Sequence, residues 1–167
     1  RFTMRNKSDA DSFKNYLDAT GLPPEEQHVV IVGGGLLGLE LAAAMKHKNA
    51  KITIVQRASR LMERQLDKVS SKLLALDEVS TVFDDEDTGE LNITLKSGKF
   101  ITANAIVYAI GTIPNIEMAR ANGLACGRGV KVNQHLQSSH PDIFAIGEIA
   151  EFNNKLFGIT SAAEEQA

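Results

Sequence analysis

Three glycines that follow an apolar run are the residues of this sequence whose spacing most clearly points to chemistry. Gly33, Gly35 and Gly38 fit the pattern G-x-G-x-x-G within "VVIVGGGLLGLELAAAM", residues 29–45. In this pattern the first glycine permits a tight turn, the second lets a pyrophosphate approach the backbone, and the third lets a helix pack closely on a strand. The stretch therefore predicts a phosphate-binding turn between a strand and a helix.

The helix that opens at this turn predicts an anion site formed mainly by residues 35–38. The first amide groups of a helix have no carbonyl partner within it, and the helix dipole adds partial positive charge at the same end. The glycines alone would be weak evidence. Here, however, a strand precedes them and a second strand follows the helix within about 30 residues, as the dinucleotide fingerprint requires. The alternative is a glycine turn with a purely structural role.

The end of the second strand, "ITIVQRASR", bears on which dinucleotide would bind. An Asp or Glu at this position usually bonds the ribose hydroxyls of NAD, whereas this chain has Gln56, followed by Arg57 and later Arg60. Glutamine can bond a ribose hydroxyl without repelling a 2′-phosphate, and the arginines could bind that phosphate through charge-assisted hydrogen bonds. The sequence favours NADPH, or no strong preference, unless both arginines are ordinary surface residues.

Glu40 lies two residues after the last glycine of the motif. A carboxylate near the first turn of a helix is electrostatically favourable, so it could be there for the stability of the helix alone. In a functional interpretation it would face the nicotinamide end of the ligand. The spacing leaves both interpretations open.

The elements that must position these residues follow an α/β order. Buried strands are predicted at 28–32 and 51–55 from their β-branched content, with the helix between them. An earlier helix is predicted at 8–21, capped by Ser8 or Asp9. After the second strand, an amphipathic helix is predicted from the apolar spacing of four residues: Leu66, Val69, Leu73 and Leu76.

The pattern then changes from helical to strand spacing. Short strands are predicted at 79–83, 91–95 and 99–111, and they form an antiparallel meander inserted into the α/β chain, from which the apolar run at 105–111 returns to the central sheet. Further short strands are predicted at 129–133 and 142–147. We therefore expect the α/β class, with a Rossmann-like doubly wound parallel sheet and an inserted antiparallel β-meander.

Composition and charge bound the class of protein. The 167 residues are 43% hydrophobic and 23% charged, which suits a packed core, and the net charge of -3 gives no electrostatic reason to expect nucleic acid as a partner. The single cysteine, Cys126, excludes a disulfide framework and a Cys-based zinc site within these residues. No run reaches the roughly 18 apolar residues that span a bilayer, and the start has no signal-peptide core. We expect a cytoplasmic chain without a membrane partner, cut from something longer.

Three separated motifs, taken together, resemble a known family. The glycine motif, "AIVYAIGTIPNIEMARANGL" at 105–124 and "HPDIFAIGEIAEF" at 140–152 occur in this order around the meander. They resemble the NAD(P)-binding domain of the pyridine nucleotide–disulfide oxidoreductase superfamily, the FAD-dependent flavoproteins. Most members have Gly-Asp where this chain has Gly147-Glu148. Residues 127–152, which include this variant, resemble NAD(P)H-dependent nitrite reductase large subunits and their rubredoxin reductase and NADH oxidase-like relatives.

The resemblance implies electron transfer, in which a hydride passes from NAD(P)H to FAD and electrons pass onward to a downstream acceptor or substrate. It implies that the cofactors carry the chemistry while the protein binds and orients them. The pyrophosphate of the dinucleotide would be held by Gly33, Gly35, Leu36, Leu37 and Gly38.

The remaining site residues are likewise implied by the resemblance. Gln56 and Arg57 would meet the adenosine ribose, and Glu40 would lie near the nicotinamide. Gly111, in "AIGTIPN", would line the cofactor beside the carboxyl edge of the sheet. The two residues that would belong to the FAD site are Gly147 and Glu148.

The chain also departs from the family pattern, because it has no N-terminal glycine motif for FAD and no siroheme or iron–sulfur ligands. We expect residues 1–26 to be a flanking helix and linker and residues 27–140 to be the NAD(P)-binding domain. Residues 141–167 would be a return segment of an FAD-binding domain that is otherwise absent. This chain alone would then bind NAD(P)H without catalysis, so no catalytic or metal-binding residue is assigned, and a homo-oligomer stays open.

A non-catalytic redox sensor that binds NAD(P)H and reports it to a partner is the alternative function, since a fold does not fix a function. An ordinary dehydrogenase fits poorly, because it would need a hydride-handling His or Tyr/Lys constellation. None is visible around the four histidines of the chain, which are His28, His47, His135 and His140.

Overall fold

The computed structural model describes residues 1–57, 77–157 and 160–166. Arg60 and the amphipathic helix predicted from Leu66 to Leu76 lie outside these residues. The chain divides into two compact units, Arg1–Gly111 and Thr112–Ala167, and each unit is described by itself.

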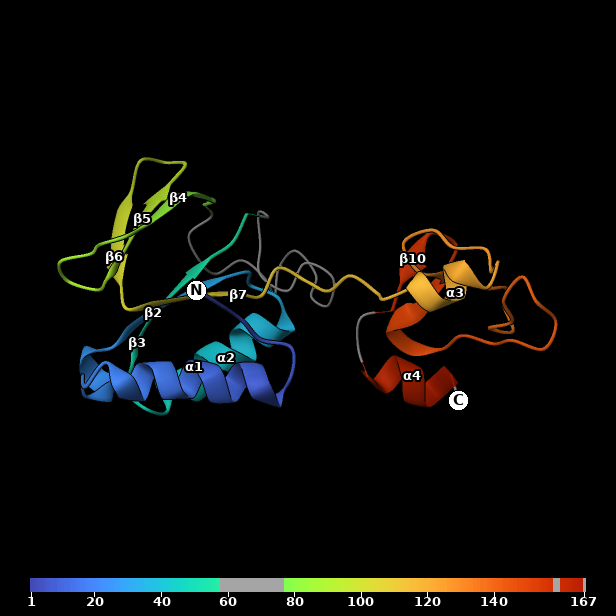
Figure 1. Ribbon diagram of the computed structural model, residues 1–167, viewed down its shortest axis with the longest axis horizontal. Helices are drawn as coiled ribbons and strands as arrows, with labels where there is room; N and C mark the ends of the chain where they lie inside the picture. Colours follow the sequence, from blue (N-terminus) through green and yellow to red (C-terminus); the bar gives the residue numbers. More distant parts are fainter. Residues whose placement is uncertain (58–76, 158–159, 167) are drawn as a thin grey trace, which may run out of the picture. The chain divides into compact units, whose positions relative to one another are not determined.

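The first unit is built on a parallel sheet, and the predicted α/β class is confirmed (Figure 1). Its four described strands lie in the order β1-β7-β2-β3, and in register Val29 of β2 lies between Ile52 of β3 and Ala105 of β7. The strands β2 and β3 have the bounds that the sequence predicts. The strands of this sheet are β1 (Phe2–Thr3), β2 (His28–Val32), β3 (Lys51–Val55) and β7 (Ala105–Tyr108).

Two helices, α1 (Lys7–Ala19) and α2 (Leu36–Lys46), lie on one face of this sheet (Figure 1). The start of α1 differs from the prediction, because Asn6 rather than Ser8 or Asp9 caps it. The Asn6 side chain accepts a hydrogen bond from Asp9 N–H at 2.9 Å, which satisfies one of the amide groups that a helix start leaves without a partner.

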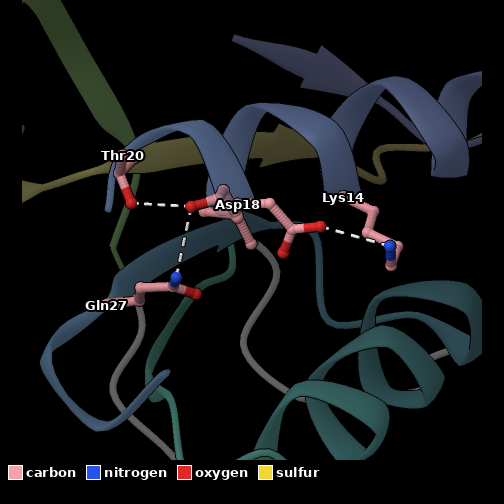
Figure 2. Close-up of polar contacts among 5 residues, drawn as sticks. Lys14, Asp18, Thr20 and Gln27 are labelled. Atoms are coloured by element: carbon pink, nitrogen blue, oxygen red, sulfur yellow. Dashed lines mark hydrogen bonds and ion pairs between the residues drawn. The ribbon is translucent and has the colours of Figure 1, made fainter. Parts of the chain in front are cut away.

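The end of α1 is closed by polar contacts that Figure 2 shows. The Thr20 hydroxyl donates to the Leu17 carbonyl at 2.6 Å, and the Gln27 amide donates to the same carbonyl at 3.3 Å. Gln27 itself is buried. After these contacts, the short 3-10 helix η1 (Pro24–Glu26) connects α1 to β2.

The antiparallel meander covers the opposite face of the sheet (Figure 1). Its strands lie in the order β4-β5-β6. The stretch predicted at 99–111 forms two strands separated by Asn104. The first lies in the meander, and the second returns to the parallel sheet, as predicted. The meander strands are β4 (Val79–Asp84), β5 (Leu91–Leu95) and β6 (Phe100–Ala103).

Alternate residues of β2 connect the two layers. Val29 and Ile31 pack with Phe13 of α1 in one core cluster, while Val30 packs with Ile93 of β5 in another. Successive side chains of a strand point to opposite faces, so a strand buried on both faces must be apolar at every position. This explains why β2 reads as a continuous apolar run rather than as an alternating one.

The second unit is built from short elements around a small core of Ile116, Val130, Ala145 and Ala150. Its three described strands lie in the order β10-β9-β8. The elements are α3 (Glu117–Ala121), β8 (Val130–Lys131), η2 (Gly147–Ile149), β9 (Ala150–Phe152), β10 (Lys155–Leu156) and α4 (Thr160–Gln166).

The prediction of a strand at 142–147 is wrong. Within that range only an isolated bridge joins Phe144 to Gln137, and residues from 147 onward turn into η2. The apolar residues of this stretch are instead split between core and surface, because Ala145 is buried and Phe144 is 59% exposed.

The division of the chain falls at Gly111 and Thr112, earlier than the expected boundary between residues 140 and 141. Strand β8 pairs with β9, so residues on both sides of the expected boundary belong to one compact unit. Which of these residues belong to an NAD(P)-binding and which to an FAD-binding domain stays a prediction.

Candidate dinucleotide-binding site

The glycine turn connects the end of β2 to the start of α2, and Gly33 makes it possible. Its φ of 115° lies in a region that side chains rarely adopt, and a Cβ there would strike the carbonyl of Ala109. Gly33 N–H donates to Val55 O of β3 at 2.8 Å. Gly33 is thus enclosed by the backbone of Ala109 and of Val55. This geometry is compatible with its predicted role in a tight turn.

Gly38 and Gly35 are required for different reasons. A Cβ on Gly38 would strike the carbonyl of Gly33 and would lie 3.4 Å from Ile31 Cγ2, so this glycine lets α2 approach β2. A Cβ on Gly35 would meet no protein atom within 4 Å, and its φ of -83° is open to any residue. Neither packing nor backbone conformation in the described chain explains the glycine at position 35.

The start of α2 presents backbone donors beside Gly35. Within the described part of the chain, no hydrogen bond is recorded from the amide groups of residues 35–38, and the first amide with a helical partner is Leu39, which donates to Gly35 O at 3.0 Å. Leu36 is 38% exposed and Leu37 is 53% exposed. The turn thus combines free donors, helix dipole and open space, which suits an anionic group.

Gln56 links the end of β3 to the turn. Its side-chain Oε1 accepts a hydrogen bond from Gly34 N–H at 2.8 Å, and its backbone carbonyl accepts one from Asp77 N–H at 3.0 Å. The first bond fixes Gly34, so the predicted adenosine-side residue is also a positioning residue for the turn. Arg57, which follows it, is exposed.

The loop after β7 lies against the same turn. Ala109 N–H donates to Val32 O at 2.8 Å. Gly111 follows with a φ of 108°, and a Cβ on it would meet no protein atom within 4 Å. Strand β2 lies between β3 and β7 in the sheet. The next strand along the chain, β3, pairs with one side of β2, and the later strand β7 pairs with its other side. Ligands of open α/β sheets bind at the carboxyl ends of strands at such a switch point.

Glu40 is exposed in the second turn of α2. It lies on the helix that begins at the glycine turn. Its predicted orientation toward a nicotinamide stays a prediction.

Gly147 and Glu148 lie in the second unit, at the start of η2. Gly147 has a φ of 70°, its N–H donates to Gln166 Oε1 at 2.7 Å, and a Cβ on it would lie 3.0 Å from Ala163 Cβ. Glu148 is exposed. The structure thus brings the residues of the first unit together around the turn, and it describes Gly147 and Glu148 only within their own unit.

Two acidic residues near the end of β3, Asp77 and Glu78, are not among the site residues that the sequence predicts. Asp77 bonds the backbone of Gln56, and Glu78 follows it with its carboxylate 2.7 Å from Lys96 Nζ. The hydrogen bond from Lys96 is the largest influence on the pKa of Glu78 and lowers it below its usual value, and the charge of Arg57 lowers it further. Their separation in sequence from Gln56 left no local signal for this contact.

A parallel sheet with a glycine turn at its switch point is the architecture of dinucleotide-binding α/β domains. The chain belongs to the pyridine nucleotide-disulphide oxidoreductase family, whose sequence profile matches residues 2–167. The predicted resemblance to this family is confirmed.

Individual relatives agree with this assignment. The chain is 32% identical over 174 residues to the assimilatory nitrate reductase electron transfer subunit of Bacillus subtilis, with 96% of this chain and 23% of that protein covered. It is 31% identical over 175 residues to the nitrite reductase [NAD(P)H] of the same organism, with 97% and 22% covered. The predicted likeness to nitrite reductases is therefore confirmed.

The fold is also similar to that of solved structures. In the covalent putidaredoxin reductase–putidaredoxin complex, the matched chain has a TM-score of 0.79 and 26% identity, with 98% of this chain and 42% of that chain covered. The present chain spans less than a quarter of the length of the two Bacillus relatives. Among the helices of the described residues, none is long and apolar enough to cross a membrane.

Proposed function

We propose that this chain is the NAD(P)H-binding part of an FAD-dependent oxidoreductase. In the full-length protein a hydride passes from NAD(P)H to FAD, and electrons pass on to an acceptor of the nitrite reductase or ferredoxin/rubredoxin type. The family supports this reaction class. So do the similar proteins, which are named as an assimilatory nitrate reductase electron transfer subunit, a nitrite reductase [NAD(P)H] and a putidaredoxin reductase in complex with putidaredoxin.

The single observation that carries the proposal is the open space at Gly35. Gly33 and Gly38 are needed by the protein itself, whereas a Cβ on Gly35 would meet nothing in the described chain. A glycine at that position is explained by a ligand that must approach the backbone. The pyrophosphate of a dinucleotide fits the exposed donors of residues 35–38.

The residues of the chain bind and orient, and the cofactors supply the redox chemistry when bound. In the proposal, the amides of Gly35, Leu36, Leu37 and Gly38 hold the pyrophosphate. Gln56 keeps Gly34 in place through its Oε1. Arg57 lies on the adenosine side.

In the proposal, the other predicted site residues contact the dinucleotide away from its pyrophosphate, or belong to the flavin-binding part. Gly111 borders the ligand beside the turn, and Glu40 lies toward the nicotinamide. Gly147 and Glu148, with residues 141–167, belong to the flavin-binding part. A cytoplasmic location and assembly with further copies of the chain are parts of the same proposal, and light scattering of the full-length protein measures the latter.

Calorimetric titration of this chain with NADH and, separately, NADPH tests the proposal. We expect binding of at least one dinucleotide, and we expect Gly35→Ala to weaken it tenfold or more, while the free energy of unfolding changes by less than about 1 kcal/mol. Gly33→Ala is the contrasting variant, because its Cβ would strike the Ala109 carbonyl and unfold the turn itself. The proposal is wrong if neither dinucleotide binds at millimolar concentration, or if Gly35→Ala binds as the wild type does.

A further inference from the structure

The start of the meander brings negative charge to the end of β3. Because Asp77 N–H donates to Gln56 O at 3.0 Å, Asp77 lies directly beside Gln56, and Glu78 is the next residue along the chain. In the proposed binding mode, this end of β3 faces the adenosine ribose, where NADPH carries a 2′-phosphate and NADH a hydroxyl. Any fixed charge here therefore affects the two dinucleotides differently.

Glu78 is held in position by the meander. Its carboxylate lies 2.7 Å from Lys96 Nζ, and its backbone carbonyl accepts a hydrogen bond from Lys96 N–H at 2.8 Å. Its own N–H donates to Asp77 Oδ1 at 2.9 Å, and Asp77 in turn accepts hydrogen bonds from the backbone N–H and the hydroxyl of Ser97. The two residues that follow β5, Lys96 and Ser97, thus fix residues 77 and 78 in place.

Arg57 follows Gln56 in the sequence and carries the charge opposite to that of Glu78. It is exposed, and its guanidinium contributes to the lowered pKa of Glu78, after the larger effect of the Lys96 hydrogen bond. A cation that is attracted to a neighbouring carboxylate is a weaker partner for a phosphate, because the two anions compete for it.

We propose that Glu78 is a specificity-determining residue that disfavours the 2′-phosphate of NADPH, an inference that rests on the proposed dinucleotide site. Many NAD-preferring folds have an acidic residue at the end of the second strand. This chain has Gln56 there, and the hydrogen bond between Asp77 and Gln56 brings the neighbouring Glu78 near the same strand end. The preference is then for NADH, opposite to the one that Arg57 and Arg60 alone suggest.

The test compares the dissociation constants of NADH and NADPH for the wild-type chain and for Glu78→Gln, which keeps the shape of the side chain and removes its charge. We expect the wild type to bind NADH more tightly, and the variant to bind NADPH about threefold to tenfold more tightly than the wild type does, with the NADH constant changed less than twofold. Glu86→Gln is the matched control, because Glu86 is an exposed acid in the far turn of the meander.

A second variant should change NADPH affinity in the opposite direction. Lys96→Gln removes the cation that partly neutralises Glu78, so it should weaken NADPH binding while NADH binding stays within twofold. Exposed ion pairs contribute little to stability, so both variants should remain folded.

The outcomes separate this inference from the proposed function. If the wild type binds neither dinucleotide, the proposed function is wrong, and the inference with it. If the wild type binds but Glu78→Gln leaves the ratio of the two constants unchanged, only the inference is wrong. It is also wrong if Glu86→Gln shifts the ratio as much, or if Lys96→Gln strengthens NADPH binding.

Discussion

The two compact units of the chain are stabilised in different ways. In the first, Val29, Val30 and Ile31 of β2 are fully buried between helices and meander. In the second, the strands have two or three residues, and a buried carboxylate, Glu151, accepts a hydrogen bond from Gly129 N–H at 2.7 Å. Burial of apolar surface is non-directional, whereas a buried polar group depends on one partner. Truncation of a buried side chain should therefore destabilise the first unit by leaving a cavity and the second by leaving a polar group without its partner.

The largest effect is expected in the first unit. Ile31→Ala removes a side chain with 0% exposure from the cluster under α1 and α2, and it should lower the free energy of unfolding by about 2–5 kcal/mol. Urea denaturation followed by circular dichroism measures this loss. Ile113→Ala is the control, because Ile113 is 83% exposed and its truncation should change stability by less than about 0.5 kcal/mol. Similar losses in both variants would contradict a core built on β2.

A smaller effect is expected at the buried carboxylate of the second unit. Glu151→Ala leaves Gly129 N–H without its acceptor and should lower stability by about 1–3 kcal/mol. Glu151→Gln keeps an acceptor oxygen and should lower it less. Thermal unfolding of both variants, with Glu164→Ala as an exposed control, measures the difference. If Glu164→Ala lowers stability as much as Glu151→Ala does, the hydrogen bond from Gly129 N–H to Glu151 contributes no measurable stability to the second unit.

A polar contact in the first unit should contribute less than its apolar core. Asn6→Ala removes the cap of α1 and should lower the free energy of unfolding by about 1 kcal/mol. Ser8→Ala, at a position that the sequence also offers as a cap, should change it by less than about 0.5 kcal/mol. Urea denaturation of the two variants side by side decides between the caps, and a larger loss in Ser8→Ala would restore the sequence-based choice.

The smallest effect is a pH dependence in the first unit. Burial lowers the pKa of His28, whose ring contacts the Thr102 carbonyl and the Thr53 hydroxyl. The unfolded chain therefore binds a proton at a pH where the folded chain does not, and the stability contributed by neutral His28 is complete above its unfolded pKa of 6.5 and declines as the pH falls below it.

This pH window differs from that of the carboxylates with lowered pKa values, Asp77, Glu78 and Asp85. Their contribution declines only as the pH falls below the unfolded values of 3.8 for the aspartates and 4.5 for Glu78. Denaturation series between about pH 7.5 and 5.5 should show falling stability in the wild type and a flatter profile in His28→Gln. Equal slopes would exclude His28 as the source.

How far the sequence predicts the structure also differs between the two units. The glycine turn, β2 and β3 follow from local patterns, because each apolar run is long and each boundary has its own signal. In the second unit the strand predicted at 142–147 does not form, since a short apolar run is compatible with a loop that places one side chain inside and the next outside. The contact of Asp77 with Gln56 joins distant parts of the chain, so no local pattern could reveal it.

The connection from β6 to β7 restricts where homologous chains can gain or lose residues. The chain leaves an antiparallel sheet and enters a parallel one through Asn104 alone, which exchanges hydrogen bonds of 2.9 and 2.7 Å with the backbone of His28 and accepts one from the Tyr16 hydroxyl at 2.9 Å. One added residue would turn each β7 side chain to the opposite face. Homologous chains should therefore gain or lose residues at the turns around Gly89 and Gly98, and keep an unbroken alignment through Asn104.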